Sequence, residues 1–155
     1  MFDSPLAKAG LLQVFIRTEK KVLIEVNPHI KIPRTFARFS SLMSQLLTKL
    51  KVRSSTGSAT LATVIKNPVT QYLPMGVRLV GTSKLAPLVN INDYVKTLGI
   101  EKKPFVFVIG AVSVGNPGME NELVTENISM SKHGLSAACV CGMVCNAMEK
   151  LWNIV

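Results

Sequence analysis

The run Phe105-Val-Phe-Val-Ile109-Gly110-Ala-Val-Ser-Val-Gly115 decides the fold class of this chain. Its first five residues are all apolar, which is typical of a strand with both faces covered, as in a parallel sheet. The strand runs straight into a loop that carries glycine at positions 110 and 115. Strands and helices alternate along much of the chain, which favours an α/β sheet. We therefore predict an α/β fold built on a parallel sheet.

Loops rich in small residues lie at the ends of three expected strands, over residues 81–87, 110–118 and 129–136. The carboxyl ends of parallel strands form the ligand crevice of open α/β sheets, so the three loops together predict one pocket. A single glycine after a strand is more often plain turn chemistry. Residues 110–115 also lack the spacing of a dinucleotide or P-loop motif, which argues against an enzyme that acts on nucleoside triphosphates.

The remaining patterns predict a hairpin, a long amphipathic helix and several shorter elements. We expect strands over residues 11–17, 21–27, 61–66, 77–80, 105–109 and 127–131. We expect helices over residues 34–50, 93–98 and 135–152. Gly99 would end the second helix, and residues 51–60 are expected to form a polar loop.

In the first long helix the apolar residues recur at intervals of three and four and form one stripe. The stripe comprises Phe36, Phe39, Met43, Leu46 and Leu50, with Leu42 and Leu47 beside it. We expect the stripe to face the core. The other side of the helix, facing solvent or RNA, is expected to carry Arg34, Arg38, Ser41, Gln45 and Lys49.

A cluster of cations stands at the start of that helix. Pro33 suits a first helical turn, because its missing N–H would have no partner there. Arg34 and Arg38 are four residues apart and would share a helical face, with Lys31 just before it. These charges and the helix N-terminus favour an anion such as a nucleic-acid phosphate. The formal net charge of +9 agrees with that partner, although a solubilising surface is the alternative.

Residues suited to covalent or metal chemistry do not form recognisable patterns. No serine or cysteine occupies a nucleophile-elbow pattern, and the general base is unknown. We expect His29 to be a solvated loop residue, whereas His133 either contacts a ligand or occupies a plain turn position. The cysteines at positions 139, 141 and 145 lack the spacing of a zinc site, so we expect core residues and no metal.

A chain of 155 residues fits one domain, which we expect to cover residues 1–155. The final helix is apolar nearly all round, which indicates either burial within the monomer or, as we favour, a homodimer interface. No stretch approaches the ~18 to 20 apolar residues of a membrane span, and residues 1–5 show no signal-peptide pattern. We therefore expect a soluble protein that is not secreted and has no membrane partner.

Several segments, in order and over essentially the whole chain, closely resemble the eukaryotic Nep1 (Emg1) family. They are Asp3-Ser-Pro-Leu-Ala-Lys-Ala-Gly10, Val22-Leu-Ile-Glu-Val-Asn-Pro28, Ile32-Pro-Arg-Thr-Phe36, Val64-Ile-Lys-Asn-Pro68, the loop with Gly110 and Gly115, Leu135-Ser-Ala137 and Leu151-Trp-Asn-Ile-Val155. The resemblance implies a SPOUT α/β knot, a parallel sheet flanked by helices in which the C-terminal segment threads a loop to form a trefoil. It also implies that the N-terminal part of the family fold, including a first strand, is missing here.

The function implied by the resemblance is N1-methylation of a pseudouridine in small-subunit (18S-type) rRNA. The cofactor would be S-adenosylmethionine, with S-adenosylhomocysteine as the product. The resemblance implies a role in small ribosomal subunit biogenesis and a location in the nucleus, within the nucleolus. The implied partners are small-subunit rRNA, a second copy of the chain, ribosome assembly factors and small-subunit ribosomal proteins.

The resemblance also assigns residues. Cofactor-binding positions fall on Ala86, Gly110, Gly115, Met130, Ser131, Lys132, His133, Gly134 and Leu135. RNA-binding positions fall on Lys31, Arg34 and Arg38, with lysine at 31 where the family usually has arginine. The third loop reads Ser131-Lys-His-Gly-Leu135 where the family typically has Ser-Asn-Tyr-Pro-Leu, so it departs from the family at its centre.

Two alternatives stand beside this function. One is an RNA-binding ribosome assembly factor with weak or no methyltransferase activity. The other is a SPOUT enzyme that modifies a different RNA, such as tRNA. Both alternatives use the basic surface to bind RNA. In the first the pocket has little or no transfer activity, and in the second it methylates a nucleotide of another RNA.

Overall fold

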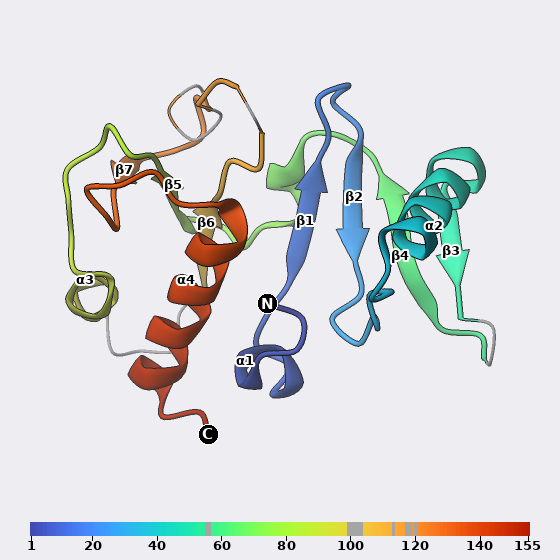
Figure 1. Ribbon diagram of the computed structural model, residues 1–155, viewed down its shortest axis with the longest axis horizontal. Coiled ribbons are helices and arrows are strands. Elements are labelled where there is room, and N and C mark those ends of the chain that lie inside the picture. The colour runs from blue at the N-terminus through green and yellow to red at the C-terminus, as the bar shows by residue number, and fades with distance from the viewer. Residues whose placement is uncertain (55–56, 99–103, 113, 117–118, 120) are drawn as a thin grey trace. The chain divides into compact units, whose positions relative to one another are not determined.

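The structure, a computed structural model, describes residues 1–54, 57–98, 104–112, 114–116, 119 and 121–155. The chain divides into two compact units, the N-terminal unit Phe2–Leu73 and the C-terminal unit Pro74–Val155. Each unit contains a sheet of its own (Figure 1). The expectation of one domain over residues 1–155 stays a prediction.

An antiparallel sheet with the strand order β1-β2-β4-β3 forms the N-terminal unit. Its strands are β1 Val14–Arg17, β2 Leu23–Val26, β3 Lys51–Arg53 and β4 Thr60–Ile65. Its helices are α1 Pro5–Lys8, α2 Phe36–Lys49 and the short 3-10 helix η1 Val69–Tyr72. The predicted hairpin is confirmed as β1 and β2, with Phe15 opposite Glu25.

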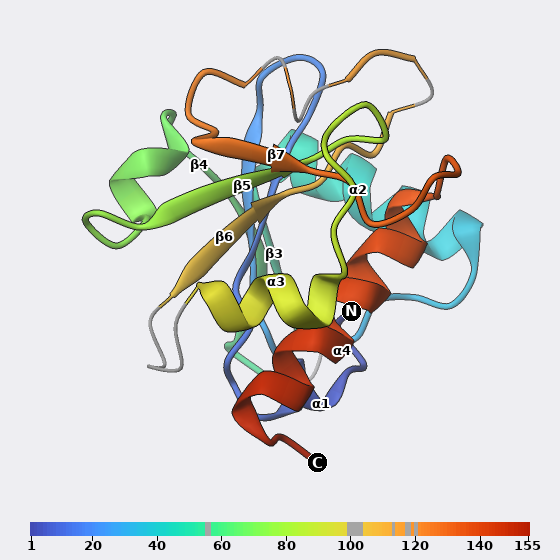
Figure 2. The same cartoon turned by 90° about the vertical axis from the view of Figure 1, so that its left-hand side faces the viewer.

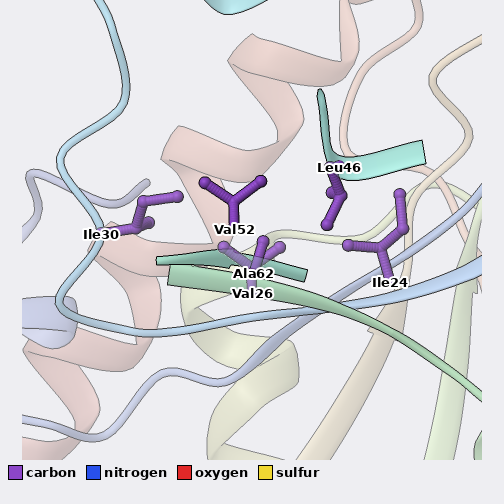
Figure 3. Close-up of a cluster of buried hydrophobic side chains, with 6 residues drawn as sticks. All are labelled: Ile24, Val26, Ile30, Leu46, Val52 and Ala62. Carbon is purple, nitrogen blue, oxygen red and sulfur yellow. The ribbon is translucent and has the colours of Figure 1, made fainter. Parts of the chain in front are cut away.

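Helix α2 packs against β3 and β4, and its apolar side meets the sheet in a buried cluster (Figure 3). The cluster consists of Ile24, Val26, Ile30, Leu46, Val52 and Ala62. Leu42 and Met43 are partly buried and pack against this cluster. The predicted inward stripe is therefore confirmed in the middle of the helix. At the ends of the helix it is wrong, because Phe36, Leu47 and Leu50 are exposed.

The start of α2 also differs from the prediction. Thr35 is the N-cap, with extended backbone dihedrals of φ −108° and ψ 143°, and the helix begins at Phe36. Pro33 and Arg34 consequently lie ahead of the helix, so Arg34 and Arg38 do not share a helical face. The extended backbone of Thr35 sets the helix start later than proline alone indicates, although the Thr35 side chain makes no cap hydrogen bond.

The region expected as a polar loop over residues 51–60 contains strand β3. Only Val52 of its three residues is buried, between the exposed residues Lys51 and Arg53. The strand lies at the edge of its sheet and pairs only with β4 among the described strands. Three residues are too short a stretch of alternation for a sequence pattern to separate this strand from a loop.

A parallel sheet with the order β6-β5-β7 forms the C-terminal unit, which confirms the predicted sheet type. Its strands are β5 Arg78–Thr82, β6 Phe105–Val108 and β7 Glu126–Ile128. The central strand β5 contains Val80, which is fully buried. Strand β6 was expected to be buried on both faces, but its residues are only half-buried, because it is an edge strand of the described sheet.

Two helices pack against each other in the same unit, α3 Ile91–Thr97 and α4 Ala137–Trp152 (Figure 2). Asn90 caps α3 by accepting a hydrogen bond from the Asn92 backbone N–H. Gly99, the predicted end of this helix, lies outside the described residues.

In the described part of the chain no helix is both long and apolar enough to cross a membrane.

The long final helix, α4, is apolar nearly all round in sequence, but only one of its sides is buried. One side buries Val144, Cys145, Ala147 and Met148. Another side is exposed and carries Ala138, Cys139, Gly142, Asn146 and Lys150. The expectation that all three cysteines belong to the core is therefore confirmed for Cys145 and wrong for Cys139, which lies on the exposed side, while Cys141 is half-buried.

Candidate functional site

The three loops that follow the parallel strands converge on one pocket of about 270 Å³. The first loop contributes Ser83 and Lys84, the second Gly110 and Gly115, and the third residues 129–131 and 133–135. The first turn of α4 adds Ala137. The prediction of a shared pocket at the carboxyl ends of the strands is therefore confirmed.

Hydrogen bonds hold the first two loops together. The Asn116 side-chain amide donates to the Ser83 hydroxyl over 2.6 Å, and the Leu85 backbone N–H donates to the same oxygen over 3.1 Å. At the end of β5, the Thr82 hydroxyl donates to the Val108 carbonyl of β6. The buried Ser83 therefore serves as the common acceptor between two chain segments that are more than thirty residues apart.

The third loop is joined to the first through backbone bonds. The Ser129 N–H donates to the Pro87 carbonyl, and the Val89 N–H donates to the Ser129 carbonyl, both over 2.8 Å. Within the third loop, the Ser131 hydroxyl accepts from the His133 N–H over 3.0 Å. These bonds use backbone N–H and carbonyl groups of the third loop, which do not depend on the side chain at position 133.

The backbone of Gly115 has a φ of 99°, a conformation that residues other than glycine rarely adopt. This turn directly precedes Asn116, whose side chain reaches Ser83. Glycine at position 115 therefore has a structural role beyond its lack of a side chain, because it allows the second loop to turn toward the first.

Most of the residues assigned to the cofactor line the pocket. Those that do are Gly110, Gly115, Met130, Ser131, His133, Gly134 and Leu135. Ala86 and Lys132 do not line it. The Ala86 N–H instead donates to the Ser83 carbonyl within the first loop, and the Lys132 side chain is exposed.

Several polar lining residues are not assigned from the sequence, among them Lys84 and Asn116. Each had a weak signal, since Lys84 is a cation within a loop of small residues and Asn116 directly follows a glycine turn. Only the contact between the loops shows that both face one pocket.

The chemistry of the pocket is that of a binding site for an organic ligand. Apolar side chains of Ile109, Ile128 and Val140 form part of its wall, while Lys84 and His133 are its titratable lining residues. Acidic residues are absent from the lining that the structure describes. Within the described ranges, no three His, Cys, Asp or Glu side chains are grouped to hold a metal ion.

A basic surface lies on the N-terminal unit. Lys31, Arg34 and Arg38 are all exposed, and Thr35 makes no side-chain cap to the α2 N-terminus. Nearby, Lys8 lies 2.9 Å from the Asp3 carboxylate and lowers the pKa of that carboxyl, and Arg34 lowers it further. The field of Arg34 therefore extends over this surface even though Arg34 lies outside the helix.

The charge of the chain is concentrated on this unit. Residues 2–73 contain eleven lysines and arginines against three acidic residues, so they carry +8 of the total +9. The C-terminal unit, which holds the pocket, is close to neutral. An anionic polymer is therefore attracted mainly to the unit that presents the exposed cations.

Comparison with known proteins shows the family. The model of the EMG1/NEP1 methyltransferase family matches residues 1–149. The chain belongs to the EMG1/NEP1 methyltransferase family. This confirms the resemblance stated from the sequence segments.

Relatives named "Ribosomal RNA small subunit methyltransferase NEP1" align along the chain. The relative from Candida albicans is 47% identical over 99% of this chain and 57% of its own length. The relative from Homo sapiens is 47% identical over 100% of this chain and 62% of its own length. The chain thus spans about three-fifths of these relatives.

The fold agrees with that of a solved family member. The crystal structure of Archaeoglobus fulgidus Nep1 bound to S-adenosylhomocysteine superposes with a TM-score of 0.74 at 20% identity. The match covers 97% of this chain and 65% of that one. The predicted SPOUT-class α/β fold, a parallel sheet with helices, is confirmed, and the threading of a trefoil knot stays a prediction.

Proposed function

We propose that this chain transfers a methyl group from S-adenosylmethionine to N1 of a pseudouridine in small-subunit rRNA. The observation that carries the proposal is the convergence of three loops on one pocket in a member of a methyltransferase family. Relatives are named as small-subunit rRNA methyltransferases, and a solved family member is bound to S-adenosylhomocysteine. The basic surface of the N-terminal unit supports an RNA substrate.

The pocket fits such a cofactor on its own chemistry. Apolar residues such as Ile109 and Val140 suit the faces of an adenine ring, while the backbone groups of the third loop suit its polar edge. Lys84 offers a cation to the carboxylate of the amino-acid part. The volume of about 270 Å³ is near the lower end for ligand pockets, so a ligand of this size would fill it closely.

The bound cofactor would supply a methyl group on a positively charged sulfur, which keeps the electron pair of the carbon–sulfur bond as the carbon–nitrogen bond forms. The chain has to orient the acceptor and favour loss of its N1 proton to water. A neighbouring cation lowers the pKa of such a ring, because it stabilises the anion. Because Lys84 is already assigned to the carboxylate of the cofactor, we assign the stabilisation of the ring anion to no particular residue.

The proposal extends to the binding partners of the chain and to its location in the cell. We propose that Lys31, Arg34 and Arg38 bind rRNA phosphates. The exposed side of α4, with Gly142 at its centre, is proposed to form a homodimer. We also propose action in the nucleolus alongside ribosome assembly factors and small-subunit ribosomal proteins.

A second candidate is an RNA-binding assembly factor with weak or no transfer activity. The observation that favours it is the separation of charge from pocket, since RNA attraction resides on a different unit from the proposed cofactor site. RNA binding is therefore expected to persist if the pocket is inactive.

The test combines binding and transfer. Calorimetric titration with S-adenosylhomocysteine should show binding, and Gly115→Ala should weaken it. Transfer of labelled methyl groups should then be measured on a pseudouridine-containing rRNA hairpin and on the same hairpin with uridine. Methylation of the pseudouridine hairpin alone supports the enzyme. Tight RNA binding without transfer supports the assembly factor, and transfer to a tRNA in preference to the hairpin supports the enzyme with a different RNA target.

A further inference from the structure

Phe36, the first residue of α2, is the most exposed aromatic side chain of the chain. It is 84% exposed, whereas Phe39, one turn further on, is half-buried. Ile32, just before the helix, is also exposed. Phe36 therefore belongs to a mixed apolar and cationic surface, which we call the entrance patch and define as Lys31, Ile32, Arg34, Phe36 and Arg38.

The charges of the entrance patch limit what can cover it. Lys31, Arg34 and Arg38 are exposed and make no ion pair within 4.0 Å in the part of the chain that the structure describes. A symmetric contact with a second copy would bring the same unit of net charge +8 against these cations, which disfavours such a contact at this face. An RNA strand offers phosphates to the cations and flat base faces to the phenyl ring.

We propose that Phe36 is a stacking platform for an unpaired RNA base, flanked by phosphates that the cations of the entrance patch bind. This inference rests on the proposed RNA substrate and adds the residue that selects unpaired over paired RNA. Aromatic side chains stack on any base face, so Phe36 confers a preference for single-stranded segments and little preference among bases. In a duplex the base faces are already stacked inside and are not available to Phe36.

The helical geometry sets the path of the strand. Phe36 and Arg38 are two positions apart, so they project from opposite sides of the first turn of α2, which is about 10 Å across. A strand that contacts both must cross the helix N-terminus. There it also passes the first backbone N–H groups, which Thr35 leaves without a side-chain cap.

The experiment measures binding of a short single-stranded RNA by fluorescence anisotropy over a range of salt concentrations. Inorganic polyphosphate, a polyanion without bases, is the matched ligand. Phe36→Ala and Phe36→Leu should each weaken RNA binding about 10-fold, which corresponds to loss of one stacked base. Neither should change polyphosphate binding or the salt slope, whereas Arg34→Ala should lower that slope by about 1.

Two controls accompany these variants. Leu47→Ala removes another exposed apolar side chain three turns along the same side of α2 and should leave RNA binding unchanged. Phe36→Trp should restore RNA binding, and its indole fluorescence, measured against the wild-type signal of Trp152, should be quenched by RNA. Because Phe36 is largely exposed, the unfolding midpoint should be the same in all Phe36 variants.

Four results would overturn the inference. If Phe36→Ala binds RNA as tightly as the wild type while Arg34→Ala binds more weakly, the RNA surface stands and the stacking role is wrong. Equal losses for RNA and polyphosphate would assign Phe36 a structural role. A sedimentation change with unaltered RNA binding would identify a contact between copies. A wild-type chain that binds no RNA would reject both this inference and the proposed RNA substrate.

Discussion

Single residues decide the shape of the pocket through backbone conformation and hydrogen bonding. Gly115 turns the second loop at φ of 99°, and the next residue, Asn116, donates to Ser83 of the first loop over 2.6 Å. Ser83 is buried, while the bond as a whole is only partly buried. The pocket wall therefore depends on a backbone conformation that glycine adopts readily and on hydrogen bonds between loops, including the one from Asn116 to Ser83.

Gly115→Ala should destabilise the protein by about 1–2 kcal/mol, because alanine pays a steric penalty at positive φ. It should also weaken S-adenosylhomocysteine binding, since relief of the strain moves Asn116 away from Ser83. Urea unfolding and calorimetric titration measure the two effects. Gly134→Ala is the stability control, because a Cβ there meets no atom within 4 Å and the backbone is not in the left-handed region. Equal stability of both variants would contradict the assignment.

Much of the residue-level site could be predicted. Resemblance to the family assigned residues in all three loops, and Gly110, Gly115 and His133 do line the pocket. Ala86 does not, because its N–H bonds back to Ser83 within the first loop. Lys84 and Asn116 were missed, since a loop sequence does not state which of its side chains turns toward the ligand.

At the scale of the elements, α2 shows how periodicity predicts burial and where it fails. Leu46 is 1% exposed and packs in the cluster of the N-terminal unit, whereas its neighbour Leu47 is 46% exposed. Phe36 has the correct spacing for the apolar stripe, yet it lies at the end of the helix and remains exposed. Spacing sets the side of the helix, and the extent of the sheet sets how much of that side is covered.

Leu46→Ala should lower the free energy of unfolding by about 2–5 kcal/mol, because it leaves a cavity among Ile24, Val52 and Ala62. The adjacent Leu47→Ala removes the same atoms from a largely solvated position and should change stability by less than about 0.5 kcal/mol. Chemical denaturation of both variants measures the difference. Similar losses in the two would contradict the burial of Leu46 against the sheet.

Tyr94 of α3 lies beside a salt bridge of the parallel sheet. Burial, together with the Glu126 carboxylate, raises the pKa of the Tyr94 hydroxyl, while Arg78 is bound to Glu126 over 2.8 Å. An unfolded tyrosine ionises near pH 10, and the folded one resists ionisation at that pH. The stability contribution of the protonated form is therefore complete below about pH 10 and declines as the pH rises further.

Unfolding followed between pH 9 and pH 11 should show a decline in stability that Tyr94→Phe reduces. Tyr72→Phe, which removes the other tyrosine of the chain, is the matched control and should retain the decline. If Tyr94→Phe and the wild type lose stability in parallel, another group is responsible. The measurement should be made at constant ionic strength, because the net charge also changes in this range.

At the scale of the whole molecule, charge and pocket are assigned to different units. Residues 2–73 carry +8, and the proposed cofactor pocket belongs to residues beyond 73. Substitutions in the entrance patch should therefore alter RNA affinity without altering S-adenosylhomocysteine affinity. This separation allows the RNA and cofactor parts of the proposed function to be tested independently.

The proposed homodimer is tested at the exposed side of α4. A Cβ at Gly142 meets no atom within 4 Å, and arginine has a higher helix propensity than glycine, so Gly142→Arg should not destabilise the chain itself. It should block the close approach of a second helix. Sedimentation should show a dimer for the wild type and a monomer for Gly142→Arg. A wild-type monomer at micromolar concentration would reject the dimer, and a dimeric variant would place the interface elsewhere.

The sequence alone determined the features that depend on short-range patterns. These are the parallel strand class of residues 105–108, the hairpin, the inward residues of α2, the basic composition and the family. Tertiary structure alone decided the start of α2 at Phe36, the existence of β3, the exposure of Cys139 and the meeting of Asn116 with Ser83. The reason is that periodicity and backbone preference act over a few residues, whereas burial and pocket lining arise from segments far apart in the chain.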